Sequence, residues 1–158
     1  YTVLADDPKS NIRIDMSLSV LPSYTRLGMA ALSPHKSITM SDDYTVLVDG
    51  MSCDNLLTRQ NILQRYCDNG ICVQFDDIKN MKKSELRDIF TGKQLVYVYH
   101  NQIDARGDKA NTEDEVFVAC KEAVNEIADL PTLTILLLRP TTDLSIKEIS
   151  LMRATRSM

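Results

Sequence analysis

The alternation of strand-like and helix-like segments is the feature that most constrains the fold of this sequence. Apolar runs of strand length, the clearest being the uncharged run Leu95–Tyr99, alternate with stretches whose apolar residues recur at helical spacing. Such alternation predicts an α/β fold with a mainly parallel sheet covered by helices on both faces. The expected strands are Ile12–Ser19, Tyr44–Val48, Ile71–Phe75 and Gln94–His100, and the expected helices are Thr25–Ser33, Asn55–Tyr66, Ser84–Phe90 and one from Thr112 onward.

Size and composition limit the class of protein. The 158 residues allow one ordinary domain, or part of one, with a real core. Hydrophobic residues make up 44% of the chain, which excludes a disordered segment, and the net charge of −4 argues against a non-specific nucleic-acid coat. The longest apolar runs, Leu95–Tyr99 and Val116–Cys120, are far shorter than the roughly 20 residues that cross a membrane.

The four cysteines form no Cys-x-x-Cys pair, so a zinc site built from thiolates is not expected. We interpret them as reduced thiols, packed as small apolar residues, in a cytoplasmic protein. No signal peptide follows Tyr1, and the chain opens on polar turn residues. We therefore expect it to start partway into a fold.

The segment Leu21–Gly28 follows the first expected strand and opens the first expected helix. A hydroxyl there, from Ser23 or Thr25, would lie near backbone N–H groups and the positive end of the helix dipole, which suits phosphate binding. The plainer alternative is that one of these hydroxyls only caps the helix, and spacing alone favours that alternative.

The segment His100–Lys109 follows the clearest expected strand and carries a second candidate site. Asp104 and Asp108 flank Gly107 in an expected loop that can turn both carboxylates toward one point. Active sites of open α/β sheets form beyond the carboxyl ends of strands, and carboxylates there bind divalent cations. An ordinary acidic loop leading to the helix at Thr112 is the alternative, and by itself it is favoured.

At these two segments the sequence resembles the PglZ family, the phosphatase-like proteins of the BREX phage-defence system within the alkaline phosphatase superfamily. Leu21–Lys36 closely resembles the family's nucleophile segment, and Val96–Lys109 is similar to its second signature. Thr45–Gly50 and Arg59–Leu63 fit between them in the expected order. The resemblance covers roughly residues 12–126 and implies a partial alkaline-phosphatase-like three-layer α/β/α domain.

The resemblance also implies roles for particular residues. Thr25 aligns with the superfamily's threonine or serine nucleophile, whose metal-activated hydroxyl attacks phosphorus, and Ser23 is the second choice. Asp104 and Asp108 align with an Asp-x-x-Gly-His pair of metal ligands, in which PglZ proteins also replace the histidine by aspartate. Zinc is the superfamily's usual ion, and carboxylates accept magnesium or manganese as well.

Two further motifs that the resemblance implies are missing. An Asp-Ala-Leu-Arg-type motif should precede Ile12, and an Asp-His-Gly motif should follow the helix that starts at Thr112. Pro140–Met158 can be back-translated so that a shift of one base reads Asp-His-Gly at about the expected place. We therefore divide the chain into 1–129, a partial PglZ domain, and 130–158, an atypical C-terminal tail for which a frameshifted translation is our hypothesis.

The sequence thus predicts a fragment of a metal-dependent phosphatase- or phosphodiesterase-like protein of a bacterial phage-defence system. We expect it to be inactive as this chain, with Thr25 as the nucleophile and Asp104 and Asp108 as surviving ligands of low occupancy. Expected partners are other proteins of the system and a phosphate ester or nucleic-acid phosphodiester, with no membrane. A non-catalytic scaffold or docking module of the defence complex is the competing hypothesis, and an α/β binding domain with accidental motifs is a third.

Overall fold

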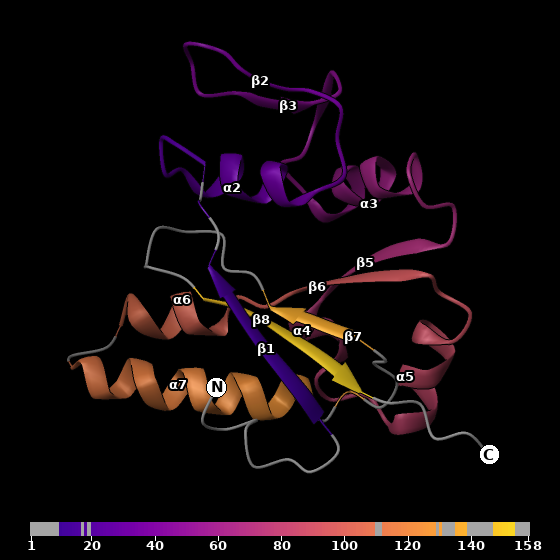
Figure 1. Cartoon of the computed structure of the whole chain (residues 1–158), viewed down its shortest axis with the longest axis vertical. Coiled ribbons are helices and arrows are strands. Elements are labelled where there is room, and N and C mark those ends of the chain that lie inside the picture. Colours follow the sequence, from indigo (N-terminus) through magenta and orange to yellow (C-terminus); the bar gives the residue numbers. More distant parts are fainter. Residues whose placement is uncertain are drawn as a thin grey trace.

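The computed structural model describes residues 10–16, 18, 20–109, 112–128, 130, 135–138 and 147–153. Figure 1 shows strands β5 and β6 between helices α2 and α3 on one side and helices α6 and α7 on the other. This helix–sheet–helix order confirms the α/β fold class. The elements are β1 (Ser10–Met16), α2 (Thr25–Leu32), β2 (Ile38–Met40), β3 (Val46–Val48), β4 (Met51–Ser52), α3 (Leu56–Gln64), β5 (Gly70–Gln74), α4 (Phe75–Ile78), α5 (Lys83–Phe90), β6 (Leu95–Tyr99), α6 (Gln102–Gly107), α7 (Glu113–Ala128), β7 (Ile135–Leu138) and β8 (Lys147–Arg153).

Strands β5 and β6 form the parallel pair on which the second candidate segment depends. Gly70 lies opposite Leu95 at the start of the pair and Gln74 opposite Tyr99 at its end. The chain between them folds into α4 and α5, which supply the crossover that parallel strands require. His100–Lys109 therefore leaves the sheet at the carboxyl ends of two parallel strands.

The alternation of segments predicted a mainly parallel sheet, but the other described strand pairings are antiparallel. Strands β2, β3 and β4 form one antiparallel sheet, and β8 pairs with β1 and β7 in another. In the first sheet, Asp49 and Gly50 make a two-residue turn with φ values of 49° and 79°. Two positive φ values suit a tight hairpin, which returns the chain beside itself and leaves no room for a crossover helix.

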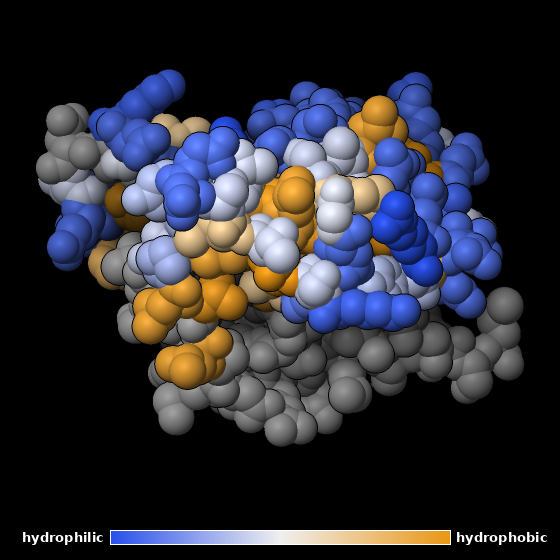
Figure 2. All heavy atoms as spheres, turned by 90° about the horizontal axis from the view of Figure 1, so that it is seen from above, coloured by the Kyte–Doolittle hydropathy of each residue, from blue (hydrophilic) through white to orange (hydrophobic). Residues whose placement is uncertain are grey.

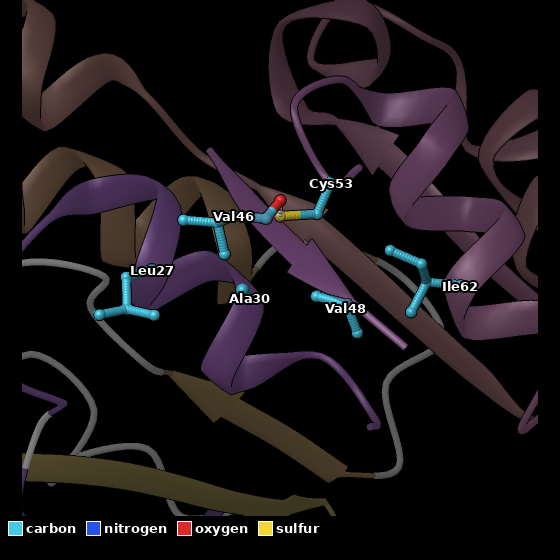
Figure 3. Packing of buried hydrophobic residues seen from close by; sticks show 6 residues of the cluster. All are labelled: Leu27, Ala30, Val46, Val48, Cys53 and Ile62. Atoms are coloured by element: carbon cyan, nitrogen blue, oxygen red, sulfur yellow. Dashed lines mark hydrogen bonds between the residues drawn. The ribbon is translucent and has the colours of Figure 1, made fainter. Parts of the chain in front are cut away.

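A first hydrophobic core joins α2, β3 and α3 (Figure 3). The helical pattern that starts at Thr25 turns its apolar side onto β3, and α3 closes the core from the other side. Burial of these side chains fixes the direction of α2 and therefore the place of its first residue. The buried members are Leu27, Ala30, Val46, Val48, Cys53 and Ile62.

A second hydrophobic core lies beneath the parallel pair, where Val96 and Val98 of β6 pack against it. Its buried residues come from α4, α5 and the residues after α7. This core holds the strand that precedes the second candidate segment. Its buried members are Phe75, Ile78, Leu86, Phe90 and Leu130.

One face of the described residues carries both hydrophilic and hydrophobic side chains. Figure 2 shows hydrophilic residues over much of this face, which is seen from above, with hydrophobic residues among them. Leu18 and Leu21, between β1 and α2, are both highly exposed. Within the described part of the chain, no helix has the length and apolar character needed to cross a bilayer.

Candidate nucleophile and metal-ligand site

Helix α2 begins at Thr25, the first candidate residue, and its start is open to solvent. Tyr24 occupies the cap position in an extended conformation, and its side chain makes no capping hydrogen bond. Ser23 and Thr25 are both exposed, and neither is the capping residue, so the capping alternative is wrong. The first N–H groups of α2 therefore lie beside a hydroxyl that makes no described side-chain hydrogen bond, the arrangement that suits an anion.

Arg26, the next residue, is engaged elsewhere. Its guanidinium Nη1 lies 3.3 Å from Oδ1 of Asp54, and both side chains are substantially exposed. Arg59 holds the same loop, because its Nε donates to the carbonyl oxygen of Cys53 at 2.8 Å and its Nη2 to that of Asp54 at 3.1 Å. Arg26 therefore helps to fix α2 to the loop between β4 and α3.

Asp104 lies in helix α6 and Asp108 is the residue that caps its C-terminal end, whereas the sequence predicted a loop. Helix α6 runs from Gln102 to Gly107, and the N–H of Asp108 donates to the carbonyl oxygen of Asp104 at 2.9 Å. The two carboxylates are thus one helical turn apart, where side chains are neighbours, and both are exposed. The structure brings these two candidate residues together.

Thr25 packs in a different part of the molecule from the two carboxylates. Helix α2 packs on β2 and β3, whereas α6 packs on α7, and Figure 1 shows the two helices on opposite sides of β5 and β6. One described bond links the two segments: the hydroxyl of Tyr97 on β6 donates to the carbonyl oxygen of Leu32 at 2.9 Å. Leu32 ends α2, so this bond fixes the helix end farthest from Thr25.

Among the described residues, no hydrogen bond or ion pair joins Thr25 to either carboxylate. The same part of the chain contains no group of three or more His, Cys, Asp or Glu side chains that could hold a metal ion. Asp104 and Asp108 offer the oxygen ligands that divalent cations prefer, and they are open to solvent. Their chemistry therefore fits two of the ligands that a metal centre needs.

His100, between β6 and α6, is a residue whose role the sequence analysis missed. Its side chain is only 9% exposed, and both ring nitrogens are buried without a hydrogen-bond partner among the described residues. Its ring lies 4.7 Å from that of Phe75, and its Nε2 is 3.7 Å from Oε2 of Glu126. The signal that could have identified it is its position directly after an uncharged strand.

Asp76, in the first turn of α4, contacts the first residue of α6. Its Oδ1 accepts hydrogen bonds from Nζ of Lys79 at 2.6 Å and from Nε2 of Gln102 at 2.9 Å. These two bonds, that of Lys79 first, lower the pKa of Asp76. Asp76 thus stays ionised near neutral pH and ties the first residue of α6 to α4.

Asp49 is a second residue that the sequence pattern did not single out. Its carboxylate accepts hydrogen bonds from the backbone N–H groups of Lys36 at 3.0 Å and Ser37 at 2.8 Å, and from the hydroxyl of Tyr66. The bond from Tyr66 is the largest cause that lowers its pKa to about 2. Asp49 therefore anchors the loop that follows α2.

Comparison with known proteins places these segments in a family. The family model described as the BREX system PglZ alkaline phosphatase-like domain matches residues 2–148. The alkaline phosphatase-like protein BrxZ of Escherichia coli O9:H4 (strain HS) is 44% identical over 120 residues, which are 75% of this chain. The alkaline phosphatase-like protein PglZ of Bacillus cereus (strain H3081.97) is 41% identical over 122 residues, which are 77% of the chain. No solved structure matches the chain.

The matches cover most of this chain but only a small part of each curated relative. The chain spans about 14% of the length of each curated relative. The family match is wider than the span of roughly 12–126 over which the motifs were recognised, and it continues past residue 129. The proposed division of the chain at residue 129 thus remains a prediction.

Proposed function

The chain belongs to the PglZ family, and from this premise we propose that it is a fragment of a metal-dependent phosphatase- or phosphodiesterase-like protein of a bacterial phage-defence system. We propose that the parent protein acts in the cytoplasm with other proteins of that system, on a phosphate ester or a nucleic-acid phosphodiester. The proximity of Asp104 in α6 and Asp108 at its C-terminal cap carries the proposal, because the pair presents two exposed carboxylates one turn apart beyond the parallel strands.

We assign the nucleophile to Thr25, with Ser23 as the second choice. Thr25 stands at the uncapped start of α2, where N–H groups and the helix dipole favour an anionic phosphoryl group. A threonine hydroxyl is a weak nucleophile without an activating group. A bound metal ion supplies that activation in such enzymes, and zinc is our first choice, with magnesium and manganese as alternatives.

The isolated chain is expected to be inactive. Its described residues place only two carboxylates together, whereas a dinuclear centre needs several ligands on each ion. The remaining ligands would come from parts of the parent protein beyond the portion that this chain matches. Metal occupancy in the chain alone is accordingly low.

A non-catalytic scaffold or docking role is the second candidate function. It is favoured by one observation: α2 and α6 pack on different partners, so the described contacts do not join Thr25 to the carboxylates. In that case the family motifs would serve binding to other proteins of the system.

The experiment that separates the two candidates is a phosphodiesterase assay of the full-length, frame-corrected protein with and without added Zn²⁺ or Mn²⁺. Thr25→Ala should lower the metal-dependent turnover by roughly a thousandfold or more, and Asp104→Asn should weaken activation by the metal about tenfold or more. Thr39→Ala and Asp42→Asn, at exposed positions of the same residue types, are the matched controls. Undiminished turnover in both test variants would contradict the proposed mechanism. If the full-length wild type and all its variants lack metal-dependent turnover, the scaffold or docking function is favoured.

A further inference from the structure

Helix α6 has little of its own to hold it in place. It contains six residues and none of them is buried, so its apolar packing is slight. Isolated helices of this length are not stable in water. The position of the two carboxylates that it carries must therefore be set by polar contacts with its neighbours.

Two glutamates of α7 reach the two ends of α6. Glu122 forms an ion pair with Arg106 in the last turn of α6, and Glu126 faces His100, which lies just before the first turn. Glu122 and Glu126 are four residues apart, so their side chains project from one face of α7. One face of one helix thus contacts the beginning and the end of the other.

The contact of Glu126 with His100 differs from an ordinary surface ion pair. The His100 ring is nine-tenths buried, and both of its nitrogens lack a hydrogen-bond partner among the described residues. Glu126 provides a carboxylate oxygen 3.7 Å from Nε2, and an approach of under an ångström would give a hydrogen bond. A buried ring N–H without a partner is costly, and among the described residues this carboxylate is placed to satisfy it.

We propose that Glu122 and Glu126 are positioning residues, which fix the two ends of α6 through Arg106 and His100 and so present Asp104 and Asp108 together. The proposal depends on the proposed function only for what α6 carries. The side-chain contacts themselves are independent of any metal. Gln102, bound to Asp76 of α4, fixes the start of α6 from the opposite side.

Amide hydrogen exchange of the chain, measured residue by residue, tests the proposal without a metal. Glu126→Ala should make the α6 amides exchange roughly tenfold faster while the α3 amides keep their rates. Glu126→Gln keeps an oxygen that can accept from the ring N–H, and it should restore rates close to those of the wild type. Asn125→Ala, at the adjacent exposed position of α7, is the control for truncation.

Unchanged α6 exchange in Glu126→Ala, or an equal rise in α3 and α6, would overturn the proposal. A Mn²⁺ titration of the same variants in the full-length protein then connects it to the site, because Glu126→Ala should weaken binding about tenfold, as loss of an outer-shell partner does. If Asp104→Asn binds Mn²⁺ as tightly as the wild-type full-length protein, the assignment of Asp104 as a ligand fails. The exchange result still decides whether Glu126 positions α6.

Discussion

The hydroxyl of Tyr66, just after α3, donates a hydrogen bond to the carboxylate of Asp49 in the turn between β3 and β4. The same carboxylate accepts from the N–H groups of Lys36 and Ser37, in the loop after α2. A single ionised group thus connects three segments around the first core. Its ionisation state should therefore affect how firmly α2 is held.

We expect the stability difference between the wild type and Tyr66→Phe to shrink in acid. The pKa of Asp49 is lowered to about 2 from its ordinary 3.8, chiefly by the bond from Tyr66. A carboxyl whose folded pKa is depressed stabilises the protein above its unfolded pKa, and this contribution is lost as the pH falls through the folded pKa. The loss should occur between about pH 4 and about pH 2.

Urea unfolding of both proteins near neutral pH and near pH 2 measures this effect. Tyr44→Phe removes a hydroxyl from an exposed tyrosine and is the control. A difference between wild type and Tyr66→Phe that is the same at both pH values would show that the Asp49 contact does not depend on ionisation.

Gly70→Ala should destabilise the chain by about 1–3 kcal/mol, as overpacking does. A Cβ at Gly70 would lie 2.7 Å from Cγ of Leu63, a fully buried residue of α3, and 3.0 Å from the carbonyl oxygen of Cys67. The close approach of α3 to the start of β5 thus requires glycine. Urea unfolding checks the prediction.

Gly107→Ala is the matched control for Gly70→Ala. A Cβ at Gly107 meets nothing within 4 Å, and alanine favours a helix over glycine by up to about 1 kcal/mol. This variant should be neutral or slightly stabilising. Equal effects of the two substitutions would contradict the packing argument.

Cys53 and Cys72 should react slowly with a thiol reagent in the folded protein, and Cys67 and Cys120 faster. Cys53 and Cys72 are buried, and burial raises the pKa of both thiols, that of Cys72 to about 11. The thiolate is the reactive form, so both burial and pKa suppress reaction. Alkylation at about pH 8 followed by peptide mapping, with urea-unfolded protein as the reference, measures the rates. If Cys72 is labelled as fast as Cys67, the parallel pair formed by β5 and β6 opens readily.

The nucleotide sequence should show that the segment after about residue 129 results from a shift of reading frame. A one-base change of frame within Pro140–Met158 can encode an Asp-His-Gly motif, which the family resemblance places after α7. Sequencing the gene and its surroundings checks this directly. An intact frame that encodes Pro140–Met158 in close relatives would refute it, and the family match through residue 148 makes that comparison necessary.

Most of the larger elements could be predicted from the sequence because their apolar residues have a regular period. The helix starting at Thr25, the helix within 55–66 and the strand Leu95–Tyr99 all form where the pattern places them. Family membership was also predictable, because two long motifs occur in order. The pattern is informative wherever one side of an element is buried.

The remaining features have no such pattern. Helix α6 buries no residue, so polar contacts with its neighbours decide its structure and the sequence suggested a loop. Strand β4 has two residues, too few to show a period, so the pattern did not predict the hairpin at Asp49. The contact between His100 and Glu126 joins residues far apart in the chain. Such contacts depend on how the second core packs.

The hydrogen bond from Tyr97 to Leu32 joins two positions 65 residues apart. The segment between them contains the β2–β3 hairpin, whose turn at residues 41–45 is exposed. We therefore expect that members of the family can lengthen or shorten the exposed turn between β2 and β3 while the segments Leu21–Lys36 and Val96–Lys109 keep their places. Length variation among relatives should accumulate in that hairpin, and it should be rare between Tyr97 and Asp108.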